Sequence, residues 1–274
     1  MTIPEGYCKA GQAEWLIKHK SLLLAQKKAT DKHADGISAP LSYIMDDDKT
    51  VITKAEAIPA TVSKIKVRAV INTTKLFDSH ADVHIDQLWN RSLKNHSTHY
   101  LVQEHEFKFN GIISENVHAF TKQIPWHTLG YNYEGNTQAL IYDAIIDRDD
   151  MPEATRPMFD AYRKGRVKQH SVFMRYKALA LGVNDDRYPE EHAVWEKYFN
   201  DIANKEDVLE NGFFWAVTEA QNIEGSAVVK GSNFATPTLY VEAKAGPSED
   251  TLHGPAQSTL TASQLLKYYS QPKI

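Results

Sequence analysis

The chain has 274 residues, with 31 Lys and Arg against 35 Asp and Glu, and a formal net charge of -4. This slightly acidic balance argues against a sequence-independent attraction to nucleic acid, and the hydrophobic content of 42% excludes a wholly disordered chain. The single cysteine, Cys8, excludes a disulfide framework and a thiolate-only zinc site. Because no apolar run is long enough for a membrane span, we expect a globular cytoplasmic protein with no membrane or nucleic-acid partner.

Composition divides the chain into three regions. Residues 1–60 are polar, and within them the pattern of residues 12–28 predicts a helix. Residues 61–242 form the predicted folded core. Residues 243–274 contain a Gly-, Pro- and Ser-rich linker, after which we expect a short terminal helix.

Strand patterns dominate the predicted core. Residues 64–72, for example, alternate apolar and polar side chains as a half-buried strand does. Further strands are predicted over residues 100–109, 111–114, 131–133, 139–146, 167–183 and 213–219, and helices over 86–93, 155–164 and from 189 onward, within a helical insertion at 183–212. There is no strict strand–helix alternation and no Gly-rich nucleotide-binding motif, so we expect a mainly antiparallel β core surrounded by helices, an α+β fold.

Ser171 is the first residue that could carry chemistry, because it lies in a strand that follows a helix and the Gly165 turn. A serine hydroxyl needs a neutral imidazole within about 3 Å to become a nucleophile. The adjacent His170 is a poor base for it, since neighbouring side chains of a strand point to opposite faces. Taken alone, Ser171 also fits an ordinary strand serine.

The base and its orienting group must therefore come from other strands. His105 is the best candidate base, although a histidine between two glutamates also fits an exposed surface position. Glu219 extends the apolar row of residues 213–219, where a carboxylate needs a charged or hydrogen-bonding partner. Pairing with a histidine would satisfy it and would fix the tautomer of that histidine, while a solvated strand end is the simpler alternative.

A second possible chemistry lies in the His- and Asp-rich segment at 78–86. If this segment is extended, His80, Asp82 and His84 lie on one side and could bind a divalent metal ion for a hydrolytic reaction. The helix predicted directly after the segment favours a simpler role for its aspartates in a turn or a cap.

The order of these features resembles that of the tailed-bacteriophage prohead serine protease family, which is related in fold to the herpesvirus maturation proteases. The family pattern begins with a strand, a D-x-x-x-D segment and a short helix, matched here from residue 64 to residue 93. The family histidine then corresponds to His105, with Gly111 behind it, and the catalytic serine corresponds to Ser171. A later acidic residue before a small-residue segment corresponds to Glu219, and the likeness covers roughly residues 64–240.

The resemblance implies a closed or nearly closed antiparallel β-barrel with helices outside it. It also implies a serine endopeptidase, active without a cofactor, that processes phage scaffold and major capsid proteins, and itself, inside the assembling prohead in the host cytoplasm. Ser171 would be the nucleophile, His105 the general base and Glu219 the group that orients the base. A homodimer would matter for activity, as it does in the herpesvirus relatives.

This sequence departs from the family pattern in two ways. The family has a glycine soon after the serine, whereas this chain has Val172-Phe173-Met174, and the insertion at 183–212 lengthens the spacing from serine to glutamate. Two alternatives to the protease therefore stay open: a catalytically inactive structural component of the phage head with the same fold, and a metal-dependent hydrolase.

Overall fold

The computed structural model describes residues 9–30 and 58–244, which belong to a compact unit that ends at Lys244. The predicted helix near the N-terminus is confirmed. Cys8 and the predicted C-terminal helix lie outside the described residues.

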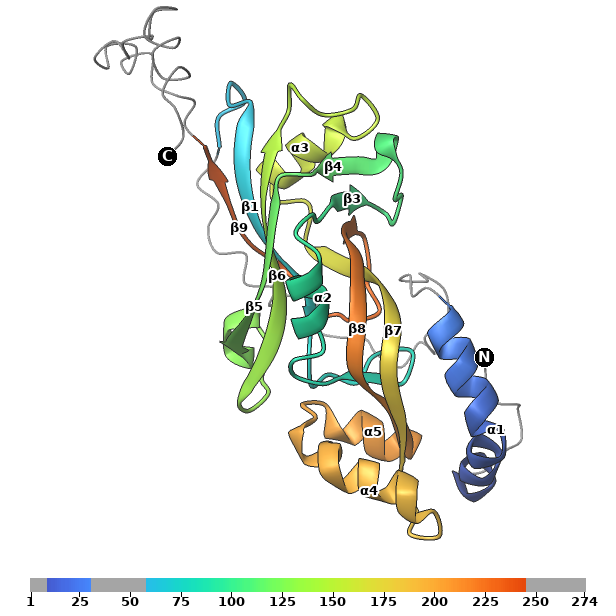
Figure 1. Cartoon of the computed structure of the whole chain (residues 1–274). Coiled ribbons are helices and arrows are strands. Elements are labelled where there is room, and N and C mark those ends of the chain that lie inside the picture. The colour runs from blue at the N-terminus through green and yellow to red at the C-terminus, as the bar shows by residue number, and fades with distance from the viewer. Residues whose placement is uncertain (1–8, 31–57, 245–274) are drawn as a thin grey trace, which may run out of the picture. The chain divides into compact units, whose positions relative to one another are not determined.

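Helices and strands follow one another irregularly along the chain, and the fold is mixed α+β and rich in sheet (Figure 1). The helices are α1 (Lys9–Ala29), α2 (Asn90–Asn95), α3 (Arg156–Arg163), α4 (Pro189–Tyr198) and α5 (Lys205–Asn211), with the 3-10 turns η1 (Phe109–Gly111), η2 (Trp126–Leu129) and η3 (Phe199–Asp201). The strands are β1 (Lys64–Thr73), β2 (Asp82–His84), β3 (Leu101–Gln103), β4 (Ile112–Ser114), β5 (Val117–Pro125), β6 (Asn136–Asp147), β7 (Gln169–Val183), β8 (Phe213–Val228) and β9 (Thr238–Ala243).

The strands form two sheets. One has the order β5-β6-β1-β9, and all its neighbouring strands are antiparallel. The other is built around the long strand β8, which pairs with β7 antiparallel over its whole length. On its other edge, β8 pairs in parallel with β2 near its start and with β3 near its end. Strand β4 pairs antiparallel with β3.

The expected closed antiparallel barrel is not found among the described residues. The pairings of β2 and β3 with β8 are parallel, and the chain crosses over through α2 between these two short strands, so both run in the same direction. At one edge the segment just before β9 joins the sheets: the backbone N–H of His170 in β7 donates to the carbonyl of Thr236, and that of Val70 in β1 donates to the carbonyl of Pro237, each at 3.0 Å. The strands therefore make two linked sheets.

Two strands differ from the sequence prediction in ways that affect the site. The expected strand at 100–109 stops at Gln103, and the chain then enters a turn that contains His105. The expected strand at 213–219 continues to Val228, and its pairing with β7 extends past the polar residues after Glu219, with a register shift between Phe173 and Met174. Strand β5 was not predicted, and Tyr131 and Tyr133 lie in the connection between β5 and β6.

Residues of both sheets pack into one apolar core, and Gly225 of β8 lies close to the other sheet. A Cβ atom at this glycine would lie 2.6 Å from Cε2 of Tyr142 in β6 and 3.1 Å from Cδ1 of Ile71 in β1. Both of these side chains are fully buried. The glycine therefore lets the face of β8 opposite to Glu224 and Ser226 pack directly on the other sheet.

Gly225→Ala is expected to lower the free energy of unfolding by about 1–3 kcal/mol, because the added methyl group meets a buried ring in a packed interior. Urea denaturation of both proteins measures this loss. As a control, Val229→Ala changes a side chain that is 89% exposed and should alter stability by less than about 0.5 kcal/mol. Equal midpoints for Gly225→Ala and the wild type would contradict the packing argument.

Candidate active site

Ser171 is the third residue of β7, and its residue surface is 6% exposed. It stands directly opposite Ser226 of β8 in the antiparallel register, so the two side chains lie on the same face of the strand pair. Glu224, two residues before Ser226, shares this face. Among the described residues, no group forms a hydrogen bond with the Ser171 hydroxyl. The hydroxyl is thus not engaged in holding these parts of the fold together.

His105 reaches the same face from the turn that follows β3. Its backbone N–H donates to Oγ of Ser226 at 2.8 Å. Its ring Nδ1 lies 2.6 Å from Oε1 of Glu224. The turn therefore brings the predicted base beside two neighbours of the predicted nucleophile, although no hydrogen bond joins His105 to Ser171 in the described structure.

Glu224 is the buried acidic group of the site. Its side chain is 0% exposed, and its second oxygen, Oε2, has no hydrogen-bond partner among the described residues. Burial raises the pKa of Glu224, and the hydrogen bond and charge of His105 act against that rise. A carboxylate with one partner in a dry environment depends strongly on that partner, so the histidine and the glutamate form a tightly coupled pair.

The prediction that Glu219 orients His105 is wrong in this geometry. Glu219 is half-buried and accepts a hydrogen bond from Arg91 at 3.2 Å, at the solvent margin. It lies five residues before Glu224, which corresponds to about 16 Å along an extended strand. Glu224 could have been found from its position, because Glu224-Gly225-Ser226 lies four residues before the small-residue segment that begins at Gly231.

His170 confirms the expectation that adjacent residues of this strand point to opposite faces. It is fully buried, its Nε2 lies 2.9 Å from the Tyr162 hydroxyl, and its Nδ1 lies 3.1 Å from the carbonyl of Thr236. Burial lowers the pKa of His170 to about 4. This histidine is a neutral core residue and not a partner of Ser171.

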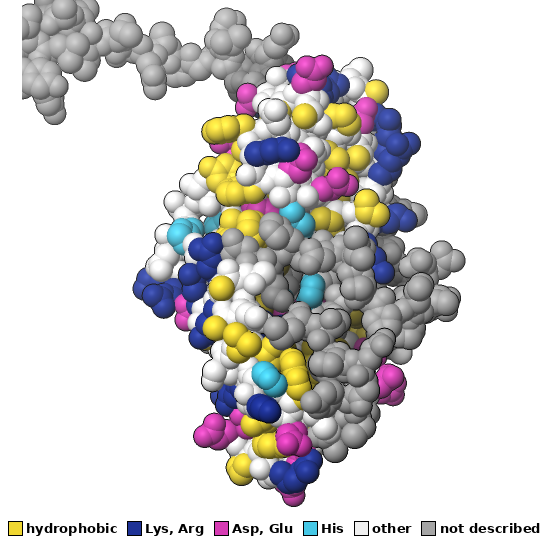
Figure 2. Space-filling view, turned by 90° about the vertical axis from the view of Figure 1, so that its right-hand side faces the viewer, with side chains coloured by type: hydrophobic (Ala, Val, Ile, Leu, Met, Phe, Trp, Pro, Cys, Tyr) yellow, Lys and Arg dark blue, Asp and Glu magenta, His cyan; other side chains and the backbone are white. Residues whose placement is uncertain are grey.

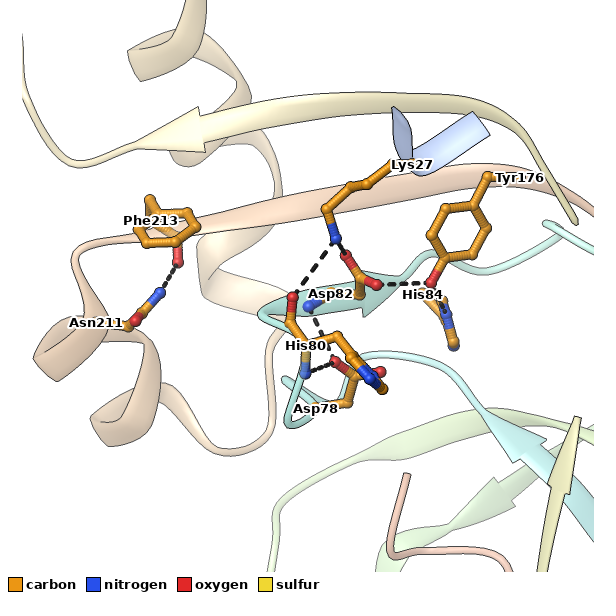
Figure 3. Close-up of polar contacts among 8 residues, drawn as sticks. All are labelled: Lys27, Asp78, His80, Asp82, His84, Tyr176, Asn211 and Phe213. Atoms are coloured by element: carbon orange, nitrogen blue, oxygen red, sulfur yellow. Dashed lines mark hydrogen bonds and ion pairs between the residues drawn. The ribbon is translucent and has the colours of Figure 1, made fainter. Parts of the chain in front are cut away.

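The His- and Asp-rich segment forms a hydrogen-bonded cluster (Figure 3). Asp82 has a side chain that is 0% exposed, and its two oxygens bind Nζ of Lys27 at 2.5 Å and the hydroxyl of Tyr176 at 2.7 Å. Burial raises the pKa of Tyr176, so this hydroxyl stays protonated and donates. Further in, Nε2 of His84 lies 3.4 Å from the Tyr176 hydroxyl, and its Nδ1 lies 2.9 Å from Nδ2 of Asn72.

This geometry disfavours the metal hydrolase alternative. The Lys27 ammonium occupies the position at Asp82 that a cation would take. The backbone N–H of His80 donates to Asp78, which closes a turn at the start of the segment. Within residues 9–30 and 58–244, no three His, Cys, Asp or Glu side chains are grouped closely enough to bind a metal ion.

The chain matches no protein-family model, no curated protein and no solved structure. Within the described ranges, every helix is too short or too polar to cross a lipid bilayer.

The buried position of His170 predicts a pH-dependent stability. Between pH 6.5 and about 4 the unfolded chain takes up a proton on this histidine that the folded chain does not. The free energy of unfolding should therefore fall by about 3 kcal/mol as the pH is lowered through this range. His170→Gln removes the titrating group, so urea unfolding across this range should show a flatter pH dependence. Parallel curves for the two proteins would contradict this assignment.

The contact between Lys27 and Asp82 predicts a large effect of a single change in α1. Lys27→Met should lower the free energy of unfolding by about 3 kcal/mol, because it removes an ammonium partner from a buried carboxylate. Adding Asp82→Asn to that variant should recover part of the loss, since the buried charge is then gone. The matched control is Lys28→Met, an exposed position in the same helix, which should change stability by less than about 0.5 kcal/mol. Equal effects of the two lysine substitutions in urea unfolding would contradict the assignment.

Proposed function

We propose that this chain is a serine endopeptidase in which Ser171 is the nucleophile, His105 the general base and Glu224 the orienting carboxylate. The observation that carries the proposal is the 2.6 Å contact between His105 and the fully buried Glu224, on the face that also bears Ser171. Serine, histidine and carboxylate in this functional relation recur on unrelated folds, so the chemistry depends on their geometry and not on chain order.

The proposed reaction follows from the roles of the three groups. The Nδ1–H of His105 is held by Glu224, which leaves Nε2 as the nitrogen that takes the proton from Ser171. The serine oxygen then bonds to the peptide carbonyl carbon, and the protonated histidine gives its proton to the departing amine as the C–N bond breaks. In the second half, His105 takes a proton from water, the resulting hydroxide attacks the acyl carbon, and the proton returns to Ser171 as its ester bond breaks.

Burial of Glu224 serves this mechanism in one specific way. When His105 accepts a proton, the imidazolium forms next to a carboxylate that is shielded from water, where the attraction between opposite charges is strongest. The pair therefore stabilises the charge that develops during proton transfer. A half-buried glutamate at the solvent margin, such as Glu219, would contribute much less, because solvent would screen it.

The resemblance to phage prohead proteases supplies the proposed biological setting. In that setting the substrates are scaffold and major capsid proteins, the enzyme also processes itself, and the fold is a distant variant of the herpesvirus maturation protease. The support is the order of the strand, the Asp-rich segment, the histidine, the serine and the acidic residue along the chain. The sequence Glu224-Gly225-Ser226 continues this order into the small-residue segment that follows.

A non-catalytic structural component with the same constellation is the second candidate. The observation that favours it is the lack of a hydrogen bond between Ser171 and His105 in the described structure. Catalytic hydrogen bonds are often long in a free enzyme and shorten when substrate binds. A chemical probe of Ser171 therefore separates the two candidate functions better than the separation of Ser171 and His105 does.

The test is covalent labelling by a fluorophosphonate, in which a bond forms between the serine oxygen and phosphorus while fluoride leaves. The wild type should be labelled at Ser171, and Ser171→Ala should not react. Glu224→Gln should slow labelling roughly 100-fold or more, because the amide no longer holds the histidine in its productive tautomer. Glu219→Gln is the matched control and should react at the wild-type rate.

Self-processing has its own readout in the same proteins. The intact mass of the wild type should be lower than that of Ser171→Ala if the active enzyme trims its own ends. A wild type that does not react with the probe at Ser171 would contradict the protease and support the non-catalytic candidate. Equal slowing by the Glu219 and Glu224 substitutions would contradict the assignment of the orienting group.

A further inference from the structure

The turn that carries His105 has an unfavourable backbone conformation. Glu104 and His105 are consecutive and have φ angles of 45° and 59°. Residues with a Cβ atom rarely adopt this left-handed region, and such conformations persist only where the surroundings hold them in place. The site therefore contains an element that fixes this turn.

Ser226 is that element. Its hydroxyl accepts a hydrogen bond from the backbone N–H of His105 at 2.8 Å and donates one to the carbonyl of Val102 at 3.3 Å. It thus bridges the two ends of the segment 102–105, in which β3 leaves the edge of β8. Ser226 is 0% exposed, so water cannot replace either bond.

The rest of the turn is closed by backbone bonds that do not involve this hydroxyl. The N–H of Glu104 donates to the carbonyl of Ala227 at 3.0 Å, and the N–H of Phe107 donates to the carbonyl of His105 at 2.9 Å. These bonds hold the turn near the end of β8, and the N–H of His105 itself donates to the Ser226 hydroxyl. The Ser226 side chain therefore contributes directly to fixing the backbone of His105.

We propose that Ser226 is the positioning residue of this site: its hydroxyl holds the backbone of His105 so that the imidazole meets Glu224 and faces Ser171. The three residues lie together because Ser226 is opposite Ser171 in the register and two residues after Glu224. Ser226 is not a second nucleophile, since both of its bonds are committed to the turn. The catalytic consequence rests on the proposed protease function, whereas the positioning itself does not.

The first test is the rate of fluorophosphonate labelling of Ser171. Ser226→Ala should lower this rate roughly 100-fold, because a displacement of about 1 Å in a catalytic group is enough for such a loss. Ser226→Thr keeps the hydroxyl and should stay within a few-fold of the wild type. The matched control is Ser114→Ala, which removes another buried serine hydroxyl that bonds a backbone carbonyl, that of Ile145, at 2.6 Å. It should leave the labelling rate unchanged.

The second test is the ring N–H signal of His105 in a nuclear magnetic resonance spectrum of histidine-labelled protein. A proton held between Nδ1 and a buried carboxylate gives a low-field resonance, which is assigned by its loss in His105→Gln. This resonance should be retained in Ser226→Thr and Ser114→Ala and lost in Ser226→Ala. Retention of the resonance, or of the wild-type labelling rate, in folded Ser226→Ala would overturn the proposal.

The two readouts also distinguish a failure of the protease function from a failure of the positioning role of Ser226. If the wild type is not labelled, the protease function fails, and the resonance alone still decides whether Ser226 positions His105. If the wild type is labelled and Ser226→Ala is labelled equally fast, the protease stands and the positioning role fails.

Discussion

The candidate site depends on one buried ionic contact, that between Glu224 and His105. A carboxylate with no exposed surface needs a partner, and the histidine is the one that the described structure gives it. Because the second carboxylate oxygen has no hydrogen bond, the contact with His105 is the main compensation for burial. The buried glutamate needs a partner, and this need is met by placing the histidine beside it.

Strand β8 places this contact, because side chains on its two faces have different roles. Gly225 faces the other sheet and lets Tyr142 pack against the strand. Glu224 and Ser226, on either side of this glycine, face the turn and Ser171. Packing and candidate chemistry are thus coupled: the sheets approach closely at the residue between the two polar side chains, which fixes the strand where the site needs rigidity.

The cluster around Asp82 follows the same physical rule with a different outcome. Its buried carboxylate is balanced by Lys27 of α1 and by the Tyr176 hydroxyl, so the Asp-rich segment connects the N-terminal helix to β7. The contact contributes to structure and leaves little room for a metal ion. Two acidic residues that look alike in the sequence therefore differ in role, because one is paired with an ammonium group and the other with an imidazole that can exchange a proton.

The sequence by itself determined the elements whose signals are local: the helix at the N-terminus, the alternating strand β1, the helix that starts at Pro189, and the opposite orientations of His170 and Ser171. It also indicated His105 and Ser171 as a candidate base and a candidate nucleophile, although nothing local related them to each other. Only the tertiary structure decided that Glu224, and not Glu219, meets the histidine. The reason is that the length of β8, its register shift and its parallel pairing with β3 are set by partner strands, and these contacts leave no periodic signal in the sequence of β8 itself.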